Sequence, residues 1–304
     1  MEKSSAAALA AGAFGVGALV AYKIATRPYK PPKVWEPTSS GGQWASINSH
    51  ISGARTQAEL PKGKHPIQLY SLGTPNGVKA TITLEEICEM NPKFEYDAWL
   101  TKIDGAQFTS GFVAVNPNAK VPAMMDNSTS PPTRVFESGS IMVYLCDKYD
   151  TNGTLLPKEP SKRAEVLNWL FWQMGSAPYW GNFGHFHSYA PMKIKYGIDR
   201  FSQQLKCHLD LLDKHLAKKR YIVGDAYSLA DIAIYPWIGK IVQGKLYDGA
   251  FLAAEEYKNI KRWADEIALR PAVVRGNKVN RTWGSPSEQL PERHSREDFA
   301  KVPA

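Results

Sequence analysis

Cysteine is scarce in this sequence, which has only three in 304 residues. Cys88, Cys146 and Cys207 are odd in number and far apart, and none belongs to a C-x-x-C pair. That number and spacing argue against a disulfide framework and a cysteine-based zinc site. All three fall in apolar helical patterns, so we expect small buried side chains there. The lack of a disulfide framework is typical of a reducing compartment.

Clusters of one charge sign and of metal ligands are also missing. The formal net charge is +8, but no basic stripe is interleaved with aromatic residues, which argues against nucleic acid as a partner. A mildly positive field favours small anionic ligands instead. His185 and His187 have no acidic residue nearby, and we therefore expect packing or surface histidines rather than a metal site.

Charge is absent from residues 4–22, a stretch rich in Ala and Gly that basic residues follow. Its length matches the ~17–25 residues that a membrane-spanning helix needs. With the basic flank on the cytosolic side, it predicts a membrane anchor for a protein that faces the cytoplasm. A mitochondrial presequence is the alternative, although Glu2 is acidic and Lys3 is the only early base. A loose Ala–Gly tail remains a third interpretation.

The rest of the chain divides by composition and periodicity. The hydrophobic segment occupies residues 1–24. Residues 25–65 are rich in Pro, Gly, Ser and Lys, which indicates an extended arm rather than a module. Apolar residues at 44–48 could hold this arm against the body. We expect an N-terminal domain at 66–152, a helical domain at 160–275 and a polar tail at 276–304 that wraps the surface.

The segment 66–152 alternates strand and helix signals. Residues 67–72 alternate like a strand, and Thr74-Pro75 then provides a hydroxyl cap with proline in the first helical turn. Further strands are expected at 94–100, 121–125 and 133–136, with a polar loop ending at Phe112 and a helix at 140–149. The order β-α-β followed by β-β-α predicts a thioredoxin-like α/β domain.

The apolar periodicity of residues 160–275 predicts an all-helical domain. Helices are expected from Ser161 onward, at 196–216, at 229–240 and at 257–269. Ser228 and Asp231 have the spacing of a capping box, and Tyr227 and Ile232 that of a hydrophobic staple. The predicted architecture is a thioredoxin-like domain followed by an all-α domain.

Position 74 is where a redox member of the thioredoxin-like fold keeps its own cysteine, and here it is threonine. A reactive thiol must therefore come from outside, and glutathione is the obvious donor. A helix N-terminus stabilises a thiolate. Hydrogen bonds from Thr74 and Asn76 to the sulfur would lower its pKa by roughly one to two units without either residue acting as a base. Both are our candidate catalytic residues.

Two further segments suit a bound peptide thiol. A cis Val121–Pro122 bond would turn the Val121 N–H and C=O outward to pair with an extended peptide, although trans is the default for such a bond. Glu137 and Ser138, at the next helix start, suit the α-amino and α-carboxyl ends of a γ-glutamyl group. Plain helix capping is the alternative role for this pair.

Several motifs resemble the nu-class (YghU-like) branch of the glutathione S-transferase superfamily. The resemblance runs from Lys33 to about Asp298. It is carried by the segments 69–77, 94–100, 116–123, 134–140, 168–172, 183–186 and 281–282. This family implies the glutathione transferase fold and glutathione-dependent reduction of disulfide bonds by a homodimer that needs no metal and holds up to two glutathiones per subunit.

The resemblance also implies roles for single residues. Thr74, Pro75 and Asn76 would face the thiols, and Val121 would pair with the cysteinyl backbone. Gln107 and Lys120 would address the glycine end, and Glu137 with Ser138 the γ-glutamyl end. Asn48 and Arg200 would hold a second glutathione. The sequence departs from its bacterial relatives at Gln173-Met174, where they have leucine-glutamine, and this leaves part of the second site open.

The leading hypothesis is a membrane-tethered, glutathione-dependent disulfide-bond reductase. A transferase that adds glutathione to an electrophile would use the same sulfur activation. A non-catalytic regulatory protein that binds glutathione is a third hypothesis.

A secretory signal at the N-terminus ranks last among the interpretations of that segment, because reduced glutathione is scarce outside the cell.

Overall fold

The computed structural model describes residues 30–38, 41–42, 47 and 50–303. The chain forms two compact units, Met1–Ser40 and Gly41–Ala304. The expected membrane anchor, residues 4–22, lies outside the described residues, as does most of the apolar stretch at 44–48. Within the described part of the chain, no helix has both the length and the apolar character needed to span a bilayer.

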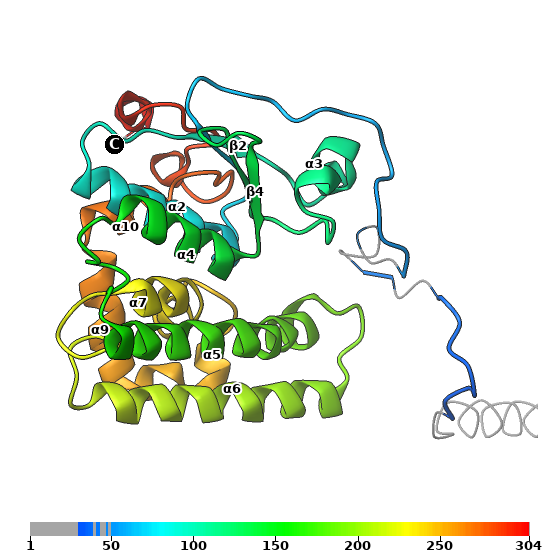
Figure 1. Cartoon of the computed structure of the whole chain (residues 1–304). Coiled ribbons are helices and arrows are strands. Elements are labelled where there is room, and N and C mark those ends of the chain that lie inside the picture. Colours follow the sequence, from blue (N-terminus) through cyan, green and yellow to red (C-terminus); the bar gives the residue numbers. More distant parts are fainter. Residues whose placement is uncertain (1–29, 39–40, 43–46, 48–49, 304) are drawn as a thin grey trace, which may run out of the picture. The chain divides into compact units, whose positions relative to one another are not determined.

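A four-stranded mixed sheet forms the centre of the thioredoxin-like half of the second unit (Figure 1). Its strands are β1 (Ile67–Ser71), β2 (Asp97–Leu100), β3 (Ala123–Asp126) and β4 (Thr133–Phe136), in the order β2-β1-β3-β4. β1 pairs with β2 in parallel and with β3 antiparallel, and β3 pairs antiparallel with β4. The predicted order of elements along the chain, β-α-β followed by β-β-α, and the predicted hairpin are therefore confirmed.

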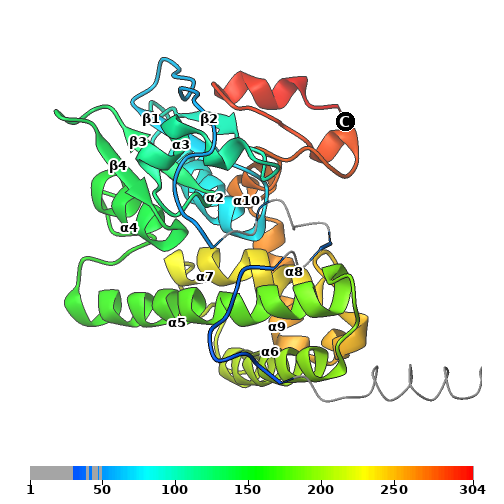
Figure 2. The ribbon, with the colours of Figure 1, turned by 90° about the vertical axis from the view of Figure 1, so that its right-hand side faces the viewer.

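Helices α2 (Pro75–Met90) and α4 (Ser138–Tyr149) pack side by side against this sheet (Figure 2). Leu69 of β1, Leu84 of α2 and Leu145 of α4 are fully buried in their shared core. A short helix, α3 (Ser110–Val115), begins before the predicted end of the polar loop at Phe112, because Thr109 caps it and Phe112 is completely buried. A 3₁₀ turn, Ala106–Phe108, precedes it.

The second half of this unit is helical, as predicted. Its α-helices are α5 (Pro160–Gly184), α6 (Lys195–Leu216), α7 (Leu229–Ile234), α8 (Lys240–Val242), α9 (Lys258–Ala268) and α10 (Pro271–Gly276). Wider π turns occupy His185–Tyr189 and Tyr235–Gly239, and 3₁₀ turns occupy Ala250–Leu252, Ala254–Glu256, Pro286–Glu288 and Arg296–Lys301. Trp180 of α5, Leu209 of α6 and Trp263 of α9 are buried in one core.

The predicted single helix at 229–240 is interrupted by the π turn at Tyr235–Gly239. Pro236 has no N–H to donate to the preceding turn, and its ring disfavours regular helical geometry there. The capping box that starts α7 is confirmed: the Ser228 hydroxyl caps the helix, and the Asp231 carboxylate accepts from the Ser228 N–H at 2.9 Å. This interruption matters because it places Trp237 at the junction with the thioredoxin-like half.

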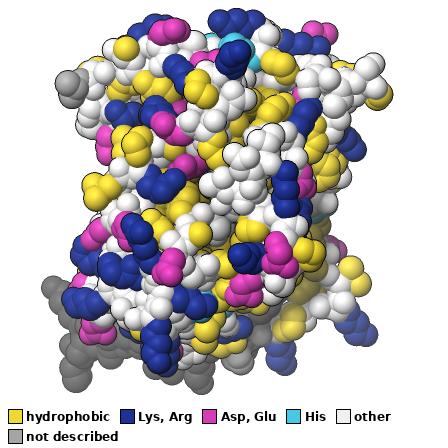
Figure 3. Space-filling model, turned by 60° about the vertical axis from the view of Figure 1, so that its left-hand side comes forward, with side chains coloured by type: hydrophobic (Ala, Val, Ile, Leu, Met, Phe, Trp, Pro, Cys, Tyr) yellow, Lys and Arg dark blue, Asp and Glu magenta, His cyan; other side chains and the backbone are white. Residues whose placement is uncertain are grey.

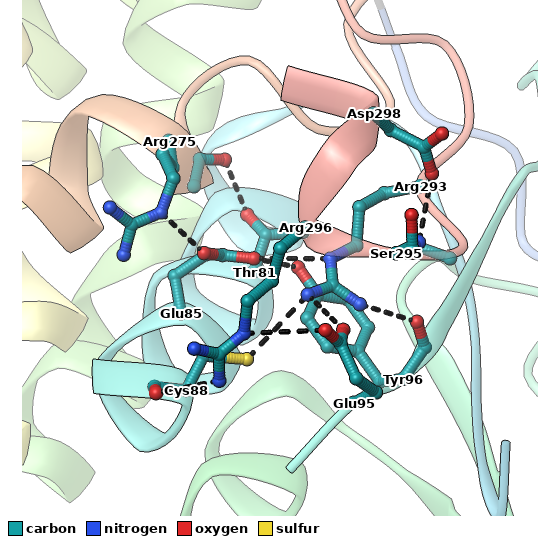
Figure 4. A network of polar contacts seen from close by, with 12 residues as sticks. Thr81, Glu85, Cys88, Glu95, Tyr96, Arg275, Arg293, Ser295, Arg296 and Asp298 are labelled. Atoms are coloured by element: carbon teal, nitrogen blue, oxygen red, sulfur yellow. Dashed lines mark hydrogen bonds and ion pairs between the residues drawn. The ribbon is translucent and has the colours of Figure 1, made fainter. Parts of the chain in front are cut away.

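The C-terminal tail, residues 276–304, does more than wrap the surface, because a few of its side chains are buried. Arg293 is fully buried, and its guanidinium lies 3.3 Å from Glu85 and 2.5 Å from Glu95 (Figure 4). It also donates to the backbone oxygen of Tyr96 at 2.7 Å. Three acceptors around one cation make burial of the charge tolerable. The tail thus contributes to the core against α2.

Two of the three cysteines follow the prediction. Cys88 and Cys146 are buried, but Cys207 is exposed on α6. The helical pattern around Cys207 is apolar on one face only, and this position falls on the other face, near exposed Asp210 and Lys214. On the face shown in Figure 3, charged side chains of both signs are interspersed rather than gathered by sign.

Candidate functional site

The N-terminus of α2 has the local chemistry that the sequence predicts. Thr74 is the N-cap, and its hydroxyl oxygen accepts from the Gly77 N–H at 3.3 Å, while Pro75 occupies the first helical turn. A Cβ at Gly77 would lie 1.9 Å from the Leu72 oxygen, so only glycine fits this close turn. Pro75 has no N–H and the Val78 N–H donates to the Thr74 backbone oxygen at 2.9 Å, so the backbone N–H of Asn76 is the one left in the first turn to donate to a ligand.

The side chain of Asn76 is oriented by a residue from the helical half. The indole nitrogen of Trp237 donates to Asn76 Oδ1 at 3.1 Å. An indole N–H is only a donor, so it must meet the amide oxygen and not the amide nitrogen. The Asn76 NH₂ group is therefore left to donate to a ligand in the adjoining cavity.

A cavity of about 390 Å³, the smaller cavity, opens over this helix start. Trp237 and Tyr247 of the helical half also line it. The structure brings together here all but two of the predicted site residues: Thr74, Pro75, Asn76, Gln107, Lys120, Val121, Glu137 and Ser138. These residues come from four separate segments of the chain, and their convergence was predicted from the sequence.

One end of the smaller cavity is built by the loop around α3. Gln107 is buried, and its side-chain oxygen accepts from the Gly105 N–H at 3.1 Å, which leaves its NH₂ group as a donor. Asn116 Nδ2 donates to the Lys120 backbone oxygen at 2.6 Å and so fixes the segment before Val121. The Lys120 side chain is exposed and provides positive charge at this end.

The Val121–Pro122 peptide bond is cis. Among the described residues, neither the N–H nor the C=O of Val121 has a hydrogen-bond partner. Val121 lines the smaller cavity, so both groups are available to an extended peptide there.

The start of α4 forms the opposite end of the smaller cavity. Glu137 has a left-handed backbone, with φ at 68°, and the helix begins at Ser138, two residues before the predicted start. Such a conformation is unfavourable for glutamate and is typical of functional sites. Ser138 is buried, and its hydroxyl oxygen accepts from the Nζ of fully buried Lys79 at 3.4 Å.

A second cavity of about 990 Å³, the larger cavity, lies between α4 and α5. It shares Asn76, Glu137, Ser138 and Trp237 with the smaller cavity. Its other walls are mostly apolar and include Val143, Leu170, Phe171, Met174 and Ala177. The two cavities therefore adjoin at the N-terminus of α2, where Asn76 lines both.

Two predicted binding residues are not placed at either cavity. Asn48 lies outside the described residues. Arg200 is exposed on α6, bonds to Gln204 at 3.3 Å and lies 6.0 Å from the ring centre of Tyr179. Their assignment to a second glutathione stays a prediction. In the described part of the chain, no group of three or more His, Cys, Asp or Glu side chains could hold a metal.

Sequence reasoning missed Trp237 and Tyr247. Trp237 belongs to a segment predicted as an ordinary core helix, whereas in the structure it lies in the π turn and lines the smaller cavity. Tyr247 follows in a loop, where its φ of 55° is strained for a tyrosine. Burial raises the pKa of its hydroxyl, so it stays protonated and can donate a hydrogen bond. A positive φ leaves no signal in the sequence when the residue is not glycine.

A protein family and a known protein both match this chain. Residues 195–271 match the family described as glutathione S-transferase, C-terminal domain. The chain is 54% identical over 276 residues to the disulfide-bond oxidoreductase YghU of Escherichia coli K12, covering 89% of this chain and 95% of that protein.

Solved structures agree with this match. The glutathione complex of YghU from Streptococcus pneumoniae is 50% identical, with a TM-score of 0.79 over 84% of this chain and 99% of that one. A glutathione transferase family member from Pseudomonas fluorescens, with two glutathiones bound, is 38% identical with a TM-score of 0.64, covering 69% and 92% of the two chains.

Proposed function

Because this chain belongs to the glutathione S-transferase superfamily, we propose that it reduces disulfide bonds with glutathione as the electron donor. One observation carries the proposal: Thr74 and Asn76 both line the smaller cavity at the N-terminus of α2, where the protein has no cysteine of its own. The similarity to a disulfide-bond oxidoreductase supports this choice among the reactions of the superfamily.

The smaller cavity suits one glutathione with its sulfur at α2. In this arrangement Glu137 and Ser138 bind the γ-glutamyl end, and Val121 pairs with the cysteinyl backbone. Gln107 and Lys120 address the glycine carboxylate. The backbone N–H and the side-chain NH₂ of Asn76 then stabilise the thiolate, since both present positive ends of dipoles to it. A lower thiol pKa raises the fraction of nucleophile at neutral pH.

The reaction needs two glutathiones and no protein thiol. The first thiolate attacks one sulfur of the disulfide, forms a mixed disulfide and releases one substrate thiolate. The second thiolate attacks the glutathione sulfur of the mixed disulfide and releases the other substrate thiolate. Two glutathiones are thus oxidised to glutathione disulfide, and the substrate gains two electrons and two protons. Holding both thiols near one helix start supplies their orientation.

The second glutathione would occupy the space next to the first. We assign Asn48 and Arg200 to it on the family pattern alone. The P. fluorescens relative holds two glutathiones, which supports this stoichiometry. Native mass spectrometry with glutathione would count ligands per protomer directly.

The proposal is tested by assaying purified protein with 2-hydroxyethyl disulfide and glutathione, coupled to reduction of the glutathione disulfide formed. We expect turnover of the disulfide to exceed turnover of an aryl halide. Conjugation of the aryl halide without disulfide reduction would contradict the proposed reaction and show that the protein transfers glutathione to electrophiles instead. Failure to bind glutathione at millimolar concentration would contradict both and favour a regulatory scaffold.

Transfer of glutathione to an apolar electrophile is the second candidate. The apolar walls of the larger cavity favour it, because they adjoin Asn76 at the point where the sulfur would lie. A hydrophobic co-substrate would gain binding energy from burial there, at about 25 cal/mol per Å² of apolar surface. The paired assays above distinguish this candidate from disulfide reduction.

We also propose that the protein is a homodimer. The Phe171 ring at the rim of the larger cavity is 67% exposed, and a second copy that covered it would bury apolar surface. The same native mass spectrum would report the mass of the assembly. A monomer at working concentration would contradict this part of the proposal.

Residues 4–22 are proposed as a membrane anchor with the body facing the cytoplasm. The support is their length and lack of charge. Carbonate extraction of membranes from the native host tests it, since a spanning helix stays in the pellet. Recovery in the supernatant would contradict the anchor, and enrichment in mitochondria would favour a presequence.

A further inference from the structure

Lys79 is a fully buried lysine one turn along α2 from Asn76. Its Nζ donates to Gln173 Oε1 at 2.6 Å and to Ser138 Oγ at 3.4 Å, and neither partner carries a charge. Lysine is almost never fully buried without an acidic partner. Burial lowers its pKa to about 7, and the charge of nearby Glu137 opposes this shift.

The charged groups on the neighbouring elements do not neutralise Lys79. Glu137 at the start of α4 acts on it but is exposed to solvent. On α2 itself, Glu85 and Glu86 bond to arginines of the α10 region. Other charged or titratable groups on the packed elements have hydrogen-bond or ion-pair partners of their own: Arg270 and Arg275 at α10, Asp231 at α7, and Tyr144, Asp147 and Lys148 on α4. The Tyr235 ring in the π turn packs against Trp263.

Ser138 connects this lysine to the ligand site. It lines both cavities, whereas Lys79 reaches only the larger one. Because the Ser138 oxygen accepts from Lys79, its hydroxyl proton must point elsewhere. The acceptor within reach is the Met174 sulfur at 3.8 Å, a weak one. A carboxylate at the start of α4 would be a far better acceptor for the same proton.

We propose that Lys79 is a positioning residue for the γ-glutamyl carboxylate of glutathione, acting through Ser138, and that the protein takes up a proton at Lys79 when this carboxylate binds. The inference rests on the proposed function and deepens it. The chain Lys79–Ser138–carboxylate places a buried cation behind the hydroxyl that contacts the ligand. The ligand supplies the negative charge that the buried lysine lacks.

The pH dependence of the affinity for the ligand follows from the negative charge of the ligand's carboxylate. A carboxylate nearby favours the ammonium form, so binding raises the pKa of Lys79. Below pH 7 the lysine is already protonated, and affinity does not change with pH. Above pH 7 binding requires proton uptake, so the affinity for the ligand falls as the pH rises. This fall ends once the pH exceeds the pKa of Lys79 in the complex. Each unit by which binding raises that pKa corresponds to about tenfold in affinity.

The experiment is isothermal titration calorimetry of the full chain with S-methylglutathione, which keeps both carboxylates but has no thiol to ionise. Titrations between pH 6.5 and about 8 in two buffers of different ionisation enthalpy give the protons taken up. We expect uptake that grows above pH 7 and a matching loss of affinity. Lys79→Met should abolish the uptake and give weaker, pH-independent binding.

A matched control and a second variant keep the test independent of folding. Lys240 on α8 also has a pKa lowered to about 7, chiefly by burial, but it lines neither cavity. Lys240→Met should leave the proton uptake unchanged. Gln173→Glu places a carboxylate 2.6 Å from the ammonium position, which should hold Lys79 protonated and move the loss of affinity to higher pH.

The outcomes of this experiment distinguish the role of Lys79 from the proposed function. Binding of S-methylglutathione without proton uptake, or uptake that persists in Lys79→Met, would overturn the role of Lys79 and leave the proposed function standing. No binding at any pH would overturn the proposed function and this inference together.

Discussion

The Trp237 indole donates to Asn76 Oδ1 at 3.1 Å and so joins the helical half to the N-terminus of α2. This bond assigns the Asn76 amide without ambiguity, because the indole can only donate. The helical domain therefore does more than close the cavity. It decides which end of the amide is left to donate to a ligand in the smaller cavity.

Trp237→Phe tests this relationship. Phenylalanine fills similar space but cannot donate, so the Asn76 amide is free to rotate and loses part of its effect on the thiolate. We expect kcat for disulfide reduction to fall by about tenfold or less, in line with one hydrogen bond. Trp169→Phe is the control, since that indole bonds to Glu165 away from both cavities. Equal loss in the two variants would contradict the assignment.

Much of this site follows from local sequence, and the rest does not. Thr74-Pro75 and Ser228 with Asp231 are short-range signals, and the helices they start are found where predicted. The Trp237–Asn76 bond joins residues 161 positions apart, and no local pattern encodes it. The same holds for Arg293, whose charge predicts exposure until the tail brings it to Glu85. Tertiary packing overrides the local preference in both cases.

Asn76→Asp tests the proposed thiolate donor directly. The substitution keeps the size of the side chain, replaces the NH₂ donor by an oxygen and adds negative charge beside the sulfur. We expect the pKa of bound glutathione to rise by about one to two units and neutral-pH turnover to fall at least tenfold. Ultraviolet absorbance of the thiolate against pH measures the first effect.

The matched control for this change is Asn118→Asp, which adds the same charge elsewhere in the smaller cavity. It should raise KM and leave the thiol pKa unchanged. In a double-mutant cycle, Trp237→Phe should add little to Asn76→Asp, because both act through one amide. Additive losses would mean that Trp237 acts by another route.

The buried guanidinium of Arg293 predicts a large effect on stability. Arg293→Met leaves Glu85, which is 1% exposed, with one cation fewer. Breaking a buried ion pair from one side costs about 3–5 kcal/mol in the free energy of unfolding. Arg163→Met removes the exposed pair with Asp147 and should cost about 1 kcal/mol or less. Urea unfolding followed by circular dichroism measures both, and similar losses would contradict a core role for the tail.

The scheme with two external thiols makes the protein's own cysteines dispensable. Cys88 and Cys146 are buried, Cys207 is exposed on α6, and none of the three lines either cavity. Burial raises the pKa of the Cys88 thiol to about 12 and that of Cys146 well above its usual range, which keeps both protonated and unreactive. A variant with Cys88→Ala, Cys146→Ala and Cys207→Ser should therefore retain wild-type kcat with glutathione and 2-hydroxyethyl disulfide. Loss of most turnover in a variant that circular dichroism shows to be folded would mean that a resident sulfur, not a second glutathione, resolves the mixed disulfide.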